Sequence, residues 1–280
     1  MVPYRSLFLV LMASTMAAAP AIAQTSADPA AVAPVASTTA PAPICTDRPT
    51  KANVVCTVPE GAFQVETDVV NWTRNQDADT RTDTILYTNP TFKYGLGQRT
   101  DVEVNIAPYE TVHSRTDGIT DRIGGAGDLY VRVKQQLTNG SGPVQVALIP
   151  FVKAPTAKYG IGNNRWEGGV AAPVIVALPQ GWTLNFGPEV DVLADADRDG
   201  HHAQLVSLAN LSKSVGKATF YVEFWNAQNL DPTGTVHQYS VDAAAAYLIR
   251  PRLQIDLGGN FGLNRFTPDA QVYLGLSTLF

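Results

Sequence analysis

From residue 61 onward, apolar and polar residues alternate along short segments and do not recur every three or four positions. In one segment, Val102, Val104 and Ile106 are separated by polar residues, two of them acidic. Successive side chains of a β-strand point to opposite faces, so this alternation places the apolar and polar sets on different faces of a sheet. The pattern therefore predicts an all-β protein.

Twelve such segments follow one another to the end of the chain. An even number of antiparallel strands is typical of bacterial outer-membrane barrels. We therefore expect a transmembrane antiparallel β-barrel of about twelve strands. The segments cover residues 61–72, 83–95, 99–110, 127–138, 143–154, 165–178, 181–193, 202–213, 217–227, 236–249, 252–262 and 269–280.

The connections between the segments alternate between short and long. Short turns at one rim and longer loops at the other are the usual arrangement of outer-membrane barrels. With twelve strands, both ends of the barrel domain then face the periplasm. The long connections are expected at about residues 73–82, 111–126, 155–164, 194–201, 228–235 and 263–268.

Charged residues fall on only one face of the clearest segments. Lys or Arg on the lipid-facing side costs about 2–4 kcal/mol at the bilayer midplane, so the charged face is expected to line the lumen. These residues either pair into a rigid plug or line a narrow polar pathway. The predicted lining comprises Glu66, Asp68, Lys93, Asp101, Glu103, Asp128, Arg132, Lys134, Glu189, Asp191, Glu223, Asp242 and Asp256.

The last segment ends on Phe280, an aromatic C-terminus that is typical of outer-membrane barrels and is expected to be their membrane-insertion signal. A soluble β-sandwich or a lipocalin is the main alternative for the fold. Either would explain the alternation, but neither would explain the terminal aromatic residue, the regular connections and the single charged face together.

The N-terminal part of the chain has a different composition. Residues 1–23 combine Arg5, an apolar stretch and an Ala-Ile-Ala cleavage site, which predicts a secretory signal peptide. Residues 24–60 are expected to form a flexible Ala- and Pro-rich periplasmic leader, and 61–280 the barrel domain. Cys45 and Cys56 are the only cysteines, and an exported chain favours a disulfide between them.

Candidate chemistry is sparse. Asp195, Asp197 and Asp199 match the first half of a calcium-binding loop, but the twelfth position is Val206 where that loop carries Glu, so they are a weak metal site.

His113, His201, His202 and His237 lie in or beside expected long loops. Nearby Ser114, Ser207 and Ser240 lack the Gly-x-Ser-x-Gly context of a nucleophile, so a lipid hydrolase is a minor alternative. No cofactor is predicted, and the formal charge of −5 gives no basic surface for nucleic acid.

Several short motifs resemble a known family. They are Thr46-Asp-Arg-Pro49, Thr57 to Glu66, Asn89-Pro90 followed by Phe92-Lys-Tyr-Gly-Leu96, and Arg99-Thr-Asp-Val102. Together they resemble the outer-membrane transporters of the phenol meta-degradation pathway, over residues 46–280. The resemblance implies a β-barrel that moves small aromatic or other hydrophobic compounds, and it carries over no catalytic residue.

The sequence thus predicts a non-enzymatic channel or transporter for small solutes in the outer membrane of a Gram-negative cell. Outer-membrane lipid, the barrel assembly machinery and a small-molecule solute are its expected partners. A closed barrel with a structural or surface-interaction role is the alternative.

Overall fold

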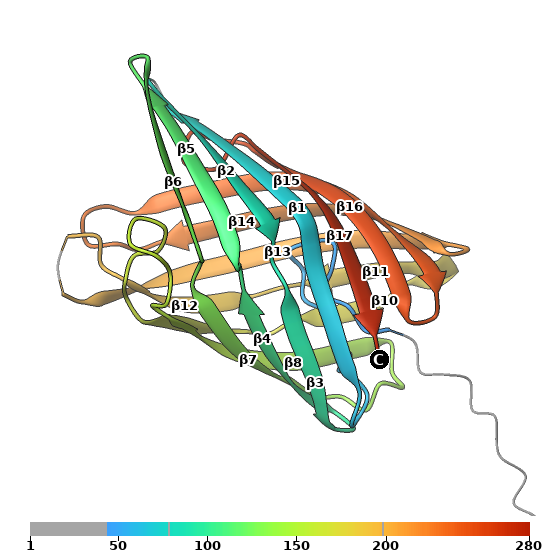
Figure 1. Ribbon diagram of the computed structural model, residues 1–280. Helices are drawn as coiled ribbons and strands as arrows, with labels where there is room; N and C mark the ends of the chain where they lie inside the picture. Colours follow the sequence, from blue (N-terminus) through green and yellow to red (C-terminus); the bar gives the residue numbers. More distant parts are fainter. Residues whose placement is uncertain (1–43, 78, 198) are drawn as a thin grey trace, which may run out of the picture. The chain divides into compact units, whose positions relative to one another are not determined.

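The computed structural model describes residues 44–77, 79–197 and 199–280, which form a closed antiparallel β-barrel (Figure 1). The first and last strands close it, from Gln64 opposite Leu279 to Arg74 opposite Ala270. Seventeen strand segments make twelve crossings, because five crossings are each divided in two: β2/β3, β4/β5, β6/β7, β9/β10 and β11/β12. The predicted fold is confirmed. The strands are β1 (Phe63–Asp77), β2 (Thr80–Thr88), β3 (Thr91–Gly97), β4 (Thr100–Ile106), β5 (Tyr109–Thr116), β6 (Ile119–Gly125), β7 (Leu129–Gln136), β8 (Val144–Ala154), β9 (Glu167–Ala171), β10 (Val174–Ala177), β11 (Trp182–Phe186), β12 (Glu189–Ala194), β13 (His201–Val215), β14 (Ala218–Asn229), β15 (Val236–Arg250), β16 (Leu253–Gly262) and β17 (Ala270–Leu279).

Proline accounts for four of the five divided crossings. Pro90, Pro108, Pro173 and Pro188 each lie between the two halves of a crossing. Proline has no N–H to donate to the ladder, so a strand is interrupted where it occurs. Neighbouring backbone bonds keep the wall continuous at these points; for example, the Ala147 N–H donates to the Pro173 carbonyl at 3.2 Å.

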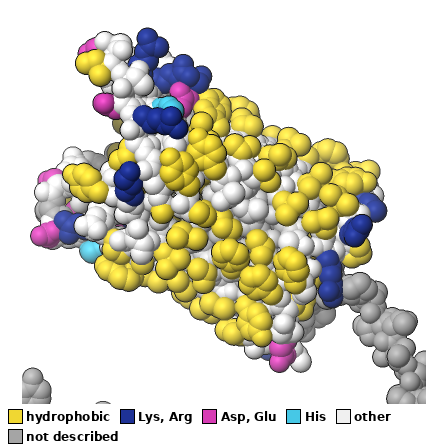
Figure 2. Space-filling model, viewed as in Figure 1, with side chains coloured by type: hydrophobic (Ala, Val, Ile, Leu, Met, Phe, Trp, Pro, Cys, Tyr) yellow, Lys and Arg dark blue, Asp and Glu magenta, His cyan; other side chains and the backbone are white. Residues whose placement is uncertain are grey.

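Burial is inverted relative to a soluble protein. The largest fully buried side chains include Lys93, Lys134 and Glu103, whereas Leu257 and Val222 are each 60% exposed. On the face that Figure 2 shows, hydrophobic side chains form a broad belt across the wall, with charged groups mostly at its ends. An apolar outside around a polar inside is the pattern of a barrel that spans lipid. None of the described residues forms a helix long and apolar enough to span a membrane.

Two expected loops are strands, which corrects the sequence analysis. Most of 73–82 belongs to β1 and β2, and most of 111–126 belongs to β5 and β6. β5 and β6 are joined by Asp117-Gly118, whose φ angles of 51° and 82° belong to a tight hairpin turn. In Figure 1 this hairpin projects beyond the rest of the barrel, at the end away from the C-terminus. The apolar alternation fades there, which is why composition suggested a loop.

The opposite rim agrees with the prediction. β13 ends at Val215 and β14 begins at Ala218, and β15 and β16 are joined just as tightly. Phe280 lies at this rim, where its N–H donates to the Phe63 carbonyl at 2.8 Å and the two rings lie 6.1 Å apart. Its role as an insertion signal stays a prediction.

The outward face provides a test of membrane depth. Val222 in mid-strand and Val215 at the turn are both 60% exposed, so Val→Arg is the same change at two heights. V222R should lower the free energy of unfolding in lipid vesicles by about 2–4 kcal/mol, and V215R by about 0–1 kcal/mol. Equal losses in denaturant titrations of the two variants would contradict a lipid-facing wall.

Candidate functional site: the lumen and its insert

Residues 44–62 precede the first strand and run inside the barrel; they are called the insert below. Val55 and Val58 on the insert are at most 2% exposed. The predicted disulfide between Cys45 and Cys56 is confirmed, with the two Cα atoms 5.9 Å apart. The leader expected over 24–60 thus has two parts. Residues 24–43, like the predicted signal peptide, lie outside the described residues, whereas 44–60 contact the wall from within.

Asp47 is the centre of the largest charge cluster. Its carboxylate accepts hydrogen bonds from the ammonium groups of Lys93 and Lys134, the latter at 2.7 Å. Both lysines also pair with Glu103, at 3.4 and 3.3 Å, and Lys93 pairs with Glu66 at 2.6 Å. Burial raises the pKa of Asp47, but the two ammonium groups outweigh it and hold this pKa well below its ordinary value. The insert therefore supplies a carboxylate that two buried lysines of the wall share.

Arg48 makes the reverse arrangement, a cation of the insert between two wall carboxylates. Its guanidinium pairs with Asp68 at 2.6 Å and with Asp256 at 2.8 and 3.1 Å. Gly275 lies directly beside it, and a Cβ built on this glycine would come within 1.9 Å of the guanidinium. A residue with a side chain at position 275 would therefore displace Arg48.

Further along the insert, Lys51 pairs with Asp242 at 2.7 Å and donates to the Ser240 hydroxyl at 2.8 Å. Glu223 accepts the backbone N–H groups of Lys51 and Ala52 at 3.2 and 3.1 Å. These carboxylates lie on β14 and β15. The wall thus holds the backbone of the insert as well as its charges.

The end of the insert is fixed against β3 and β4. The Val58 N–H donates to the Asp101 carboxylate at 2.8 Å, and the Gly61 N–H donates to the Gly95 carbonyl at 2.9 Å. A Cβ on Gly95 would lie 2.0 Å from the Pro59 carbonyl oxygen. Only glycine leaves room for the insert at this position.

The structure places the predicted lining residues on the inner side of the wall. Ten of the thirteen are nearly fully buried, and most of these pair with the insert or with each other: Glu66, Asp68, Lys93, Asp101, Glu103, Lys134, Asp191, Glu223, Asp242 and Asp256. Of the other three, Arg132 and Glu189 line a cavity, and Asp128 pairs with Lys153 at 3.2 Å. Asp47, Arg48 and Lys51 are site residues that the strand pattern does not predict, because they precede the first strand. The signal available was three charges in an otherwise nearly uncharged leader.

A cavity of about 550 Å³ remains between the insert and the wall. The insert lines it with polar and charged groups, among them Asp47 and Lys51. Its wall side carries an apolar strip from β8, β9, β12, β13, β14 and the β9–β10 break: Ile149, Phe151, Ala171, Pro173, Leu193, Val206, Leu208 and Trp225. The lumen therefore presents apolar and polar surfaces to the same space.

Two cations meet aromatic rings in this cavity. The Lys51 ammonium lies 4.8 Å from the centre of the Trp225 ring, and the Arg132 guanidinium lies 5.9 Å from that of Phe151. Arg132 makes no hydrogen bond or ion pair through its side chain among the described residues, and its Nε is buried. Trp225 therefore faces the lumen and not the lipid.

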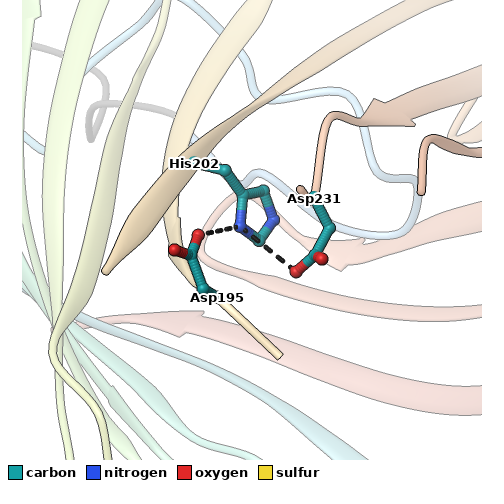
Figure 3. Close-up of side chains that lie close together, drawn as sticks. All are labelled: Asp195, His202 and Asp231. Carbon is teal, nitrogen blue, oxygen red and sulfur yellow. Dashed lines mark hydrogen bonds and ion pairs between the residues drawn. The ribbon is translucent and has the colours of Figure 1, made fainter. Parts of the chain in front are cut away.

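The acidic loop has a different geometry from a calcium-binding loop. His202 Nδ1 lies 3.0 Å from an Asp195 oxygen and 3.4 Å from an Asp231 oxygen (Figure 3). Hydrogen bonds from the Thr233 hydroxyl and amide lower the pKa of Asp231 to about 2. Asp195, His202 and Asp231 lie close enough together, and are of the right residue types, to hold a metal ion. The predicted ligands Asp197 and Asp199 are instead exposed. Asp199 pairs with Arg165 at 2.5 Å. Metal binding at the loop stays a prediction.

The fold defines an outer-membrane β-barrel. The chain belongs to the family described as "Putative MetA-pathway of phenol degradation", whose model matches residues 46–280. The match includes most of the insert as well as the whole wall.

Two solved barrels are similar in structure. The COG4313 outer membrane channel from Pseudomonas putida F1 superposes with a TM-score of 0.69 at 12% identity, covering 83% of this chain and 100% of that one. The NanC porin gives 0.52 at 9% identity, over 77% and 98%. At these identities the likeness concerns the fold. No curated protein matched the chain significantly.

The Asp47 cluster predicts a specific stability effect. D47N should lower the free energy of unfolding by about 1.5–3 kcal/mol at pH 7, because it removes the carboxylate that bonds to two buried ammonium groups, while their contacts with Glu66 and Glu103 remain. D117N, the same change at the exposed hairpin turn, should have little effect. A loss no larger than that of D117N in urea titrations would show that the cluster does not hold the insert.

The same cluster predicts a pH dependence. The pKa of Asp47 is lower in the folded state, so its contribution is complete well above the ordinary value of 3.8 and declines as the pH falls below that value. The stability difference between wild type and D47N should therefore narrow between pH 6 and pH 3. A difference that stays constant or widens over this range would contradict the assignment.

Proposed function

We propose that this protein is an outer-membrane channel that conducts small amphipathic solutes, with aromatic compounds as the preferred class. The cavity beside the insert carries the proposal. It joins an apolar strip that includes Ile149, Phe151 and Trp225 to polar groups of the insert. A solute with an aromatic ring and a polar substituent matches both surfaces, because ring faces pack on apolar and aromatic side chains.

The insert narrows the route without filling it. Its charges are neutralised by the wall through Asp47, Arg48 and Lys51, so these groups do not act as free ion-binding sites. Three charged residues of the wall line the cavity without an ion pair among the described residues: Arg132, which lies beside Phe151, and the acidic Glu189 and Asp191. Because most of the charges are paired, the channel should select solutes by shape and polarity more than by positive charge.

The family match and the porin-like relatives support a channel over an enzyme. The positions of the histidines also favour a channel over an enzyme. Among the described residues, no histidine side chain forms a hydrogen bond with a serine hydroxyl. Ser207 instead bonds to Asn226, Ser114 lies near Thr82, and Ser240 accepts from Lys51. The lipid hydrolase alternative therefore has no assembled nucleophile and base in support.

In the proposed orientation, the short turns and Phe280 face the periplasm and the long connections face the cell surface. Outer-membrane lipid surrounds the apolar belt, and the barrel assembly machinery inserts the chain. The alternative of a closed barrel with a structural or surface-interaction role predicts no solute flux.

The direct test is flux into vesicles that contain the refolded mature chain. Relative to protein-free vesicles, which phenol crosses unaided, the chain should increase the entry rates of phenol and benzoate several-fold more than that of a neutral sugar of similar size, and planar-bilayer recordings should show discrete openings. A folded barrel with neither flux nor openings would favour the closed alternative.

One residue of the apolar strip should control the preference. F151A removes the ring that faces Arg132, and aromatic contacts contribute about 0.5–1.5 kcal/mol, so the preference for phenol over the sugar should fall about two- to tenfold. The matched control is F224A, because Phe224 lies on the lipid-facing side and is 44% exposed. An unchanged ratio in F151A, or an equal drop in F224A, would remove the cavity from the route.

A further inference from the structure

The outward face of the projecting strands carries a concentrated positive charge. The ladder between β1, β2, β5 and β6 aligns two neighbouring rows on this face. One row is Arg74, Asp83, His113 and Arg122; the next, further from the barrel, is Gln76, Arg81, Arg115 and Thr120.

The register establishes that these rows face outward and not toward the lumen. Trp72, two residues before Arg74, lies opposite Val272 of β17, which is 48% exposed in the apolar belt. Residues two apart on a strand share a face, so Arg74 lies on the same outer face as Trp72, about 7 Å further along the strand toward the hairpin end. Tyr87 and Tyr109 are also exposed nearby, with rings 5.7 Å apart, and such aromatic pairs mark the membrane interface. The arginines therefore lie at headgroup level.

The two rows together contain four arginines and one carboxylate, while Asp79 and Asp117 lie beyond them at the hairpin turns. Asp83 is the only carboxylate in them, and both Arg74 and Arg81 already bond to it, at 2.9 and 2.8 Å. Arg115 and Arg122 are exposed, and their side chains make no ion pair or hydrogen bond among the described residues. Figure 2 shows the resulting group of Lys and Arg side chains at the projecting end. Two guanidinium groups remain available to a ligand.

The register also brings like charges together. Arg81 lies directly opposite Arg115, where Cβ atoms of cross-strand partners are about 5 Å apart. Such a pair is unfavourable by itself, but an anion with several oxygens relieves the repulsion by bonding to both sides. Guanidinium groups bind phosphate in this bidentate manner.

We propose that the outward rows of β2, β5 and β6 bind a phosphate group of an outer-leaflet glycolipid, through Arg115 and Arg122 with Arg81 beside them. The outer leaflet of a Gram-negative outer membrane consists of phosphorylated glycolipid, so phosphate lies at the height of these residues. The proposal goes beyond conduction and rests on the orientation proposed above, with the hairpin at the cell surface.

The test is native mass spectrometry of the folded full-length mature chain in detergent, titrated with diphosphoryl lipid A. Wild type should bind diphosphoryl lipid A at least tenfold more tightly than the dephosphorylated lipid or phosphatidylglycerol. R115Q/R122Q should lose at least tenfold in affinity, because each guanidinium that is removed takes away a charge-assisted hydrogen bond to phosphate. The matched control is R250Q/R252Q, which removes two exposed arginines at the opposite rim and should bind as wild type does.

Several outcomes would overturn the proposal. Retained affinity in R115Q/R122Q would do so, as would an equal loss in the control, which would indicate unspecific charge attraction. If R115Q/R122Q fails to fold, wild type alone still tests the proposal: equal binding of the phosphorylated and dephosphorylated lipids would overturn it. Tighter binding of phosphatidylglycerol would place the hairpin at the inner leaflet. Conductance of R115Q/R122Q should equal that of wild type, so the outcome is independent of the channel proposal.

Discussion

The structure depends on the pairing of charges inside a wall that lipid surrounds. Lys93 and Lys134 are almost completely inaccessible to solvent, and an unpaired ammonium in that environment would be severely unfavourable. Asp47 provides the shared carboxylate from a segment that is not part of the barrel sheet. The wall and the insert therefore stabilise each other: the wall orders the insert, and the insert neutralises the wall.

This mutual dependence also determines the space that remains. Ion pairs of Arg48 and Lys51 hold the insert to β1, β15 and β16, and contacts of Asp47 and Val58 hold it to β3, β4 and β7. Phe151 on β8 and Trp225 on β14 line the space that the insert leaves and form part of the apolar side of the cavity. The proposed preference for amphipathic solutes thus follows from where the ion pairs hold the insert. Gly95 and Gly275 show that the backbone of the wall accommodates it closely.

Alternation was sufficient to predict the barrel, because each transmembrane crossing must separate lipid from lumen. It failed where that constraint ends. β5 and β6 extend beyond the apolar belt, so apolar and polar residues do not alternate there. The Asp117-Gly118 pair is the one sequence feature of this segment that indicates a hairpin turn. The insert was missed because ion pairs such as Arg48 with Asp256 join residues 208 positions apart, a proximity that one sequence does not reveal. In the acidic loop, Asp195 likewise meets His202 and the distant Asp231 instead of Asp197 and Asp199.

A double-mutant cycle between Arg48 and Asp256 tests the central claim most directly, because these residues influence each other only if the insert occupies the lumen. The free energy of unfolding in vesicles is measured for wild type, R48Q, D256N and the double variant. The account predicts a coupling of about 1–3 kcal/mol between the two substitutions. Effects that add to within about 0.5 kcal/mol would show that the insert is not bound to the wall.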